Sequence, residues 1–288
     1  MRVQFLDHSF RFVLGLLYTL LLMPLLLNAK GIEDASTYHS NSVLQWNIAS
    51  RLIDTIEWKG NERVLDVGCG DGKITALLAQ KLPEGSVVGI DISQSMIDFA
   101  SHKYAEIEYP NLNFQKLDAA EITFENQFDV VTSFSALHWV MDQEKALKAI
   151  HQALNPGGAV YIQTYGAGVM NITVIADSLI NTKKWSQYFP TYVKQRVFFT
   201  DTEYQDLLES AGFQQVSVTG SWHNTTFDDR QALIHFAKPL LNFIGHLSLE
   251  LQQEFVEEVV DKVISIAGIL DDGTIQYKTF SLHAFGVK

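Results

Sequence analysis

The feature that most constrains the fold is a short apolar run that passes directly into a glycine-rich loop. Residues 64–67 read VLDV, and residues 68–72 read GCGDG. Apolar spacing typical of a helix resumes at once over residues 73–82. Glycines at a strand-to-helix junction permit tight backbone conformations and let a ligand approach the main chain closely. The pattern therefore predicts a strand, a ligand-binding loop and a helix in succession.

The same alternation of strands and helices continues along the chain. We expect strands at residues 64–67, 87–90, 112–117, 128–134, 159–164, 214–218 and 280–287. We expect helices over residues 36–56, 73–82 and 144–154, after the N-cap Ser93, and after a capping box of Thr200 and Glu203. Such alternation specifies a mostly parallel sheet with helices on both faces, which is an α/β fold.

Two aromatic-rich inserts interrupt this rhythm, near residues 166–199 and 223–272. Each follows the end of a predicted strand. In open α/β sheets the ligand crevice lies at the carboxyl ends of the strands. We therefore expect the inserts to form a lid over that crevice.

Three acidic residues near the predicted strand ends indicate which ligand the glycine loop binds. Asp66 lies two residues before Gly68, Asp91 ends the second predicted strand, and Asp118 ends the third. A dinucleotide site expects the spacing GxGxxG and a pyrophosphate, which Asp66 would repel. A carboxylate at Asp66 suits an ammonium or sulfonium group instead. Asp91 can accept hydrogen bonds from the hydroxyls of a ribose, and Asp118 can accept one from the amine of an adenine. S-adenosylmethionine carries all of these groups, and a nicotinamide cofactor is the rival interpretation.

Three segments resemble the first three motifs of the class I methyltransferases: VLDVGCGDGK, VVGIDIS and FQKLDAAEI. The resemblance covers most of residues 36–288. It implies a Rossmann-like seven-stranded sheet whose last strand is antiparallel, with residues 31–288 forming the methyltransferase domain and the inserts its helical lid. It also implies an S-adenosylmethionine site at Asp66, Gly68, Cys69, Gly70, Asp91, Ile92, Asp118, Ala119 and Ser133.

After the fourth predicted strand, the segment SALHWV is similar to one subgroup, the trans-aconitate, malonyl-carrier and juvenile-hormone-acid carboxyl methyltransferases. By that resemblance, Gln45 and Trp139 hold the acceptor carboxylate. A carboxylate is ionised at neutral pH and needs alignment rather than a general base. His138 would be the base if the acceptor were a hydroxyl or an amine. The alternatives are an exposed helical Gln45, a loop histidine and a core tryptophan.

The inserts also bear on the acceptor. Their aromatic and aliphatic side chains favour an apolar acid, such as a fatty or terpenoid acid. Lys183, Lys184, Lys194 and Arg196 either steer an anionic acceptor or form a solvated face. Methylation of another small-molecule O, N or C acceptor, and binding of S-adenosylmethionine without catalysis, remain the alternative functions.

Residues 1–30 form a separate segment in which residues 12–27 are apolar and uncharged. A cleaved signal peptide, a short membrane anchor and a non-native extension all fit this pattern. Because S-adenosylmethionine is made inside the cell, we expect a cytoplasmic active site, with membrane association only if residues 12–27 anchor the chain. Cell fractionation tests this expectation.

Composition narrows the partners. The 288 residues hold 21 Lys and Arg against 33 Asp and Glu, which gives a formal net charge of −12. A field of that sign disfavours nucleic acids as partners. The single cysteine, Cys69, excludes an intrachain disulfide and a cysteine cluster for a metal. We therefore expect a small-molecule acceptor and no metal.

Overall fold

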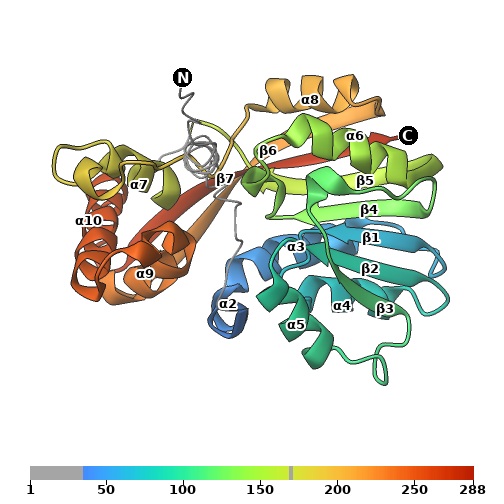
Figure 1. The fold of residues 1–288 in the computed structure, drawn as a ribbon, viewed down its shortest axis with the longest axis horizontal. Helices are drawn as coiled ribbons and strands as arrows, with labels where there is room; N and C mark the ends of the chain where they lie inside the picture. Colours follow the sequence, from blue (N-terminus) through green and yellow to red (C-terminus); the bar gives the residue numbers. More distant parts are fainter. Residues whose placement is uncertain (1–34, 169–170) are drawn as a thin grey trace, which may run out of the picture. The chain divides into compact units, whose positions relative to one another are not determined.

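The computed structural model describes residues 35–168 and 171–288, and the strands of these residues form one seven-stranded sheet (Figure 1). The strand order is β3-β2-β1-β4-β5-β7-β6, and β7 runs antiparallel to both of its neighbours. This confirms the Rossmann-like fold with an antiparallel last strand. The strands are β1 (Arg63–Val67), β2 (Ser86–Asp91), β3 (Leu112–Lys116), β4 (Phe128–Phe134), β5 (Leu154–Tyr165), β6 (Gln214–Phe227) and β7 (Ile275–Val287).

Helices cover both faces of the sheet. The α-helices are α2 (Ala35–Asn41), α3 (Val43–Thr55), α4 (Lys73–Lys81), α5 (Gln94–Lys103), α6 (Gln143–Ala153), α7 (Ile172–Ile180), α8 (Asp201–Ser210), α9 (Arg230–Ala237) and α10 (Leu249–Ala267). The 3₁₀ helices are η1 (Ala119–Glu121), η2 (Leu137–Trp139), η3 (Ser186–Tyr188) and η4 (Lys238–His246). Within the described residues, no helix has the length and apolarity needed to cross a membrane. The predictions for residues 1–30 lie outside the described residues.

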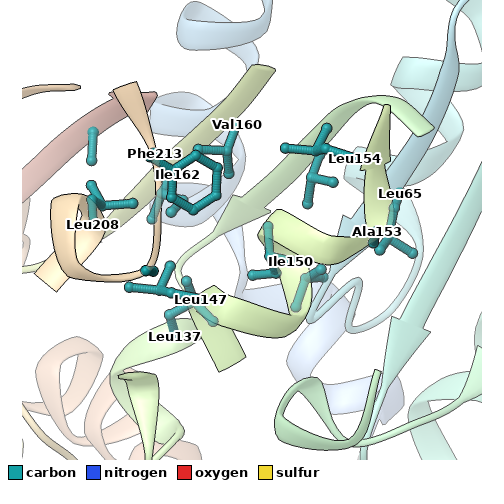
Figure 2. Packing of buried hydrophobic residues seen from close by; sticks show 14 of the residues in the cluster. Leu65, Leu137, Leu147, Ile150, Ala153, Leu154, Val160, Ile162, Leu208 and Phe213 are labelled. Atoms are coloured by element: carbon teal, nitrogen blue, oxygen red, sulfur yellow. The ribbon is translucent and has the colours of Figure 1, made fainter. Parts of the chain in front are cut away.

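Strand β1 shows how the two faces are built. Val64 and Leu65 are both fully buried, but they point to opposite sides of the pleat. Val64 packs with α3 and α4, whereas Leu65 belongs to the cluster that α6 and α8 complete. Figure 2 shows the cluster that contains Leu65, with Ile150 of α6 and Leu154 of β5. A strand buried on both faces reads as a nearly continuous apolar run, and in VLDV only Asp66 interrupts that run.

Local signals in the sequence placed two helix starts correctly. The Ser93 hydroxyl accepts from the Met96 amide at the start of α5. Thr200 and Glu203 form the predicted capping box at the start of α8, each side chain bonded to the other residue's backbone. Such caps satisfy amides that have no partner inside the helix.

Some element bounds differ from the prediction. The expected helix over residues 36–56 is two helices, because Ser42 leaves helical geometry and its hydroxyl donates to the His39 carbonyl. The fifth strand begins at Leu154 rather than at 159, with an irregular register opposite β4. The sixth strand continues to Phe227 and the seventh begins at Ile275, because β6 and β7 pair along almost their whole lengths.

Helices from both insert ranges pack on one another and on the far ends of β6 and β7, where α7, α9 and α10 gather in Figure 1. Their shared apolar core, which we call the cap cluster, centres on the fully buried side chains Trp185 and Phe255. These two rings meet edge to face with centroids 4.8 Å apart. The cap cluster is thus a second core beside the sheet.

Candidate functional site

The glycine loop leaves β1 in a conformation that only glycine adopts readily. The amides of Gly68 and Cys69 both donate to the Ile90 carbonyl of β2, at 2.8 and 2.9 Å. Gly68 has a φ of 77°, and a Cβ at this position would lie 2.1 Å from the Cβ of Ala136. The loop therefore packs against the segment after β4, and no side chain fits between them.

Asp91 fixes the loop from the neighbouring strand. Its two carboxylate oxygens accept from the amides of Gly70, at 3.0 Å, and Ser93, at 2.8 Å. Burial raises the pKa of Asp91, and these amide bonds oppose that shift. Asp91 thus lies at the glycine loop, where the sequence predicted it.

Asp66 is almost completely buried beneath the glycine loop. It is 2% exposed, and its two oxygens accept from the hydroxyls of Thr75, at 2.8 Å, and Thr132, at 3.0 Å. Burial raises the pKa of Asp66 to about 6, while the two hydroxyls lower it. These bonds join β1 to β4 and α4, so Asp66 supports the loop from beneath.

Two other predicted ligand contacts are also turned inward. Ser133 is fully buried, and its hydroxyl donates to the Val67 carbonyl at 2.8 Å. This bond joins β4 to β1, and the Ser133 side chain is not exposed. The thiol of Cys69 is buried, and burial raises its pKa. Ile92 and Ala119, by contrast, are partly exposed.

Asp118 lies two residues after the end of β3, close to where the sequence predicted it, and is partly exposed. Its Oδ1 accepts from the Ala120 amide at 2.9 Å, which caps η1. Within the described residues, its Oδ2 accepts no hydrogen bond. Asp118 and Asp91 thus both lie near the carboxyl ends of β2 and β3, where open α/β sheets bind their ligands.

Helix α2 lies against the glycine loop through Tyr38 and His39. His39 Nδ1 lies 2.7 Å from Asp71 Oδ2, and the Asp71 side chain is 7% exposed. Burial raises the pKa of Tyr38, and a Cβ at Gly70 would lie 3.8 Å from its ring. The space beside Gly70 is therefore narrow and bounded by an aromatic ring, which fits a ligand held against the main chain.

Tyr38 also lines a cavity of about 600 Å³, a figure that includes open space at its mouth. Tyr38, Gln45, His138 and Trp139 all line it, so the structure brings together the three residues predicted for the acceptor. The rest of its wall comes from α3, the end of β4, β5, β7 and the two insert ranges: Leu44, Ser135, Tyr165, Asn171, Ile172, Thr173, Arg196, Phe198, Phe236, Leu240, Tyr277 and Thr279. Most of the exposed area of the wall is apolar, as in small-molecule sites, although many of its side chains also carry a polar group.

Arg196 is buried on the cavity wall, whereas the sequence showed it only as one member of a basic cluster. It is 4% exposed, and the guanidinium carbon lies 3.6 Å from the centre of the Trp139 ring. Its Nη2 donates to the Leu240 carbonyl at 2.6 Å. Within the described residues it forms no ion pair, and among the residues that line the cavity it is the only Lys, Arg, Asp or Glu. Burial lowers its pKa to about 10, so it stays charged at neutral pH.

Three buried polar atoms on the cavity wall have no hydrogen-bond partner among the described residues: Gln45 Oε1, His138 Nδ1 and Thr279 Oγ1. Burial, helped by the charge of Arg196, lowers the pKa of His138 to about 3. His138 is therefore neutral at physiological pH. Ser135, another wall residue, has a φ of 55°, the kind of backbone strain that clusters at functional sites.

A family model described as a methyltransferase domain matches residues 59–212, more than half of the chain. The chain belongs to this family. It is a class I methyltransferase that depends on S-adenosylmethionine, which carries an electrophilic methyl group on its sulfonium sulfur. The residues around the glycine loop fit that methyl donor.

Relatives of this methyltransferase are similar along most of its length. The juvenile hormone acid O-methyltransferase of Bombyx mori is 26% identical over 81% of this chain and 86% of its own. The trans-aconitate 2-methyltransferase of Variovorax paradoxus is 26% identical over 78% of this chain and 86% of its own. A solved structure of phosphoethanolamine N-methyltransferase 2 from Haemonchus contortus, in complex with S-adenosyl-L-methionine, has a TM-score of 0.59, with 22% identity over 90% of this chain and 57% of that chain.

Proposed function

We propose that this methyltransferase transfers the methyl group to the carboxylate of a small apolar acid. The observation that carries the proposal is the buried guanidinium of Arg196, which lies on the cavity wall without an ion-pair partner in the described residues. A buried charge is costly unless it is paired, and a carboxylate is the partner that guanidinium geometry matches. Two relatives whose names specify acids, juvenile hormone acid and trans-aconitate, support this substrate class.

Gln45 and Trp139 then complete the carboxylate site. Within the described residues, neither the side-chain amide of Gln45 nor the indole nitrogen of Trp139 forms a hydrogen bond. Both N–H groups can therefore donate a hydrogen bond to a ligand in the cavity. Val197 N donates to the His138 carbonyl at 3.0 Å, and this bond ties the Arg196 segment to η2, which carries Trp139. Three donors on separate elements can thus converge on one carboxylate.

The charge state of His138 favours the same substrate class. A hydroxyl or amine acceptor must lose a proton during transfer, and a His with a pKa near 3 is a poor base at neutral pH. A carboxylate is already ionised and requires only alignment and exclusion of water. We assign His138 to the cavity wall rather than to proton transfer.

The methyl donor is held, in this proposal, by the loop around Gly68 and Gly70, by Asp91 at the ribose and by Asp118 at the adenine. Asp66 supports this loop through Thr75 and Thr132. The cap cluster and α2 form the lid that excludes water from the cavity. Because the cavity wall is mostly apolar, the body of the acceptor is apolar too.

Calorimetry with three ligands of one chain length tests the substrate class. The protein is saturated with S-adenosylhomocysteine and titrated with dodecanoic acid, dodecanol and dodecylamine. We expect the acid to bind at least about tenfold more tightly than the alcohol, because it gains a charge-assisted hydrogen bond. Equal affinities, or tighter binding of the amine, would refute the carboxylate site.

A further inference from the structure

Thr279 carries a polar group that the proposed carboxylate site does not use. It lies on β7, is 4% exposed and lines the cavity, and its Oγ1 has no partner among the described residues. The hydroxyl groups of its neighbours on the same face of the strand, Tyr277 and Ser281, do have hydrogen-bond partners. Tyr277 Oη accepts from the Ile172 amide at 3.1 Å, and Ser281 Oγ accepts from Gln163 Nε2 at 3.0 Å.

A buried hydroxyl without a partner destabilises the protein that carries it. Valine has nearly the same shape as threonine and would fill the same space without that cost. Buried polar groups in native structures are almost always hydrogen-bonded, so each exception calls for a ligand, a water or a functional reason. The position of Thr279 on a ligand cavity favours a ligand.

The charges on the cavity wall limit what that ligand group can be. Arg196 is the only Lys, Arg, Asp or Glu among the lining residues, and the carboxylate of the acceptor uses it. A second charged group on the acceptor would remain unpaired in a mostly apolar wall, which is strongly unfavourable. The group that meets Thr279 is therefore neutral.

We propose that the acceptor carries, besides its carboxylate, a neutral hydroxyl or ketone oxygen that forms a hydrogen bond with Thr279 Oγ1. This inference rests on the proposed function and narrows it from an apolar acid to a hydroxy or oxo acid with one carboxylate. Thr279 then selects among acids of similar length, while Arg196 binds the group that they share.

The test is calorimetry of the protein saturated with S-adenosylhomocysteine. The probes are dodecanoic acid and its monohydroxy and mono-oxo derivatives, with the oxygen placed at successive carbons. We expect one position to bind about fivefold more tightly than the unsubstituted acid. Thr279→Val removes that preference, whereas Thr279→Ser retains it.

Thr164→Val is the matched control. Thr164 is also buried on a strand with an unpartnered hydroxyl, but it does not line the cavity. Its variant should keep the preference, and thermal unfolding shows whether each variant is folded. The inference is overturned if no substituted acid binds more tightly than dodecanoic acid, or if Thr279→Val keeps the preference. If no acid binds at all, the proposed function falls and this inference falls with it; binding of dodecanoic acid without a preference overturns the inference alone.

Discussion

The guanidinium carbon of Arg196 lies over the indole ring of Trp139, 3.6 Å from the ring centre. A cation over the face of a tryptophan is stabilised by the negative potential of the ring. The contact also fixes the orientation of a long side chain that is otherwise flexible. One residue pair thus places a positive charge and an indole N–H on the same stretch of cavity wall.

The first prediction concerns Arg196. Arg196→Met removes the charge and keeps an unbranched apolar side chain, so we expect kcat/KM for the acid to fall about ten- to a hundredfold, the equivalent of one hydrogen bond to a charged group. Arg196→Lys keeps the charge without the planar fork, so its loss should be smaller. Steady-state kinetics measures both effects.

Lys184→Met provides the control for that experiment. Lys184 belongs to the same predicted basic cluster, but its side chain is exposed and pairs with Glu254 and Glu258. Its variant should keep wild-type kinetics. Equal losses in both variants would show that general charge, rather than the cavity position of Arg196, attracts the acceptor.

The second prediction is a trade between stability and activity at Gln45. This side chain is 8% exposed, and its Oε1 has no partner in the described residues. Gln45→Met removes a buried polar group at similar volume, so we expect the free energy of unfolding to rise by about 1 kcal/mol. We also expect kcat/KM for the acid to fall while donor affinity is retained. Urea unfolding and kinetics test the two halves, and a less stable variant with normal kinetics contradicts both.

The third prediction concerns the glycine loop. Gly68→Ala introduces a Cβ that would lie 2.1 Å from the Cβ of Ala136, at a φ of 77°. We expect affinity for S-adenosylmethionine to fall at least about tenfold, because the loop must move away from its ligand-binding position. Calorimetry with the donor measures this loss.

Gly157→Ala separates the clash from the backbone strain. Gly157 has a φ of 79°, but a Cβ there would meet nothing within 4 Å. Both variants carry strain of about 1 kcal/mol or more, whereas only Gly68→Ala carries the clash. Donor binding should survive in Gly157→Ala, and a parallel loss in the two variants argues against the loop as the donor site.

The fourth prediction is a pH dependence of stability that arises from His138. Burial lowers the pKa of the folded side chain to about 3, whereas the unfolded chain takes up a proton near pH 6.5. Because the pKa is lower in the folded state, His138 does not reduce the free energy of unfolding well above pH 6.5. It reduces that free energy as pH falls below this value. Between about pH 7.5 and pH 5.5 this amounts to about 1 kcal/mol.

His138→Phe removes this titration while preserving a ring that can stack on Phe198. Urea unfolding at the two pH values should therefore show a smaller loss of stability in the variant, by about 1 kcal/mol. Identical pH dependence in the two proteins would mean that His138 is solvated and protonates freely in the folded state.

Much of the fold followed from local patterns in the sequence. Buried parallel strands read as apolar runs, and Ser93 and Thr200 marked helix starts because a cap depends on only a few neighbouring residues. The bounds of β6 and β7 did not follow, because their extension is stabilised by pairing between segments distant in the chain.

Site residues that follow strand ends could be placed from the sequence. Residues whose burial depends on tertiary packing could not. Asp91 and Asp118 follow directly from strand ends. Ser133 was placed by motif alone, and the sequence does not show that its hydroxyl faces Val67 inside the sheet. Arg196 looked like a member of an exposed basic cluster, because only the tertiary contact with Trp139 reveals that it is buried.

Turnover with identification of the product tests the central claim most directly. The purified chain is incubated with S-adenosylmethionine and an equimolar mixture of apolar acids, alcohols and amines of matched length, and the products are analysed by mass spectrometry. We predict methyl esters of the acids, formed in equal amount with S-adenosylhomocysteine and strongly reduced in Arg196→Met. Methyl ethers or methylamines in place of the esters would contradict a carboxylate acceptor.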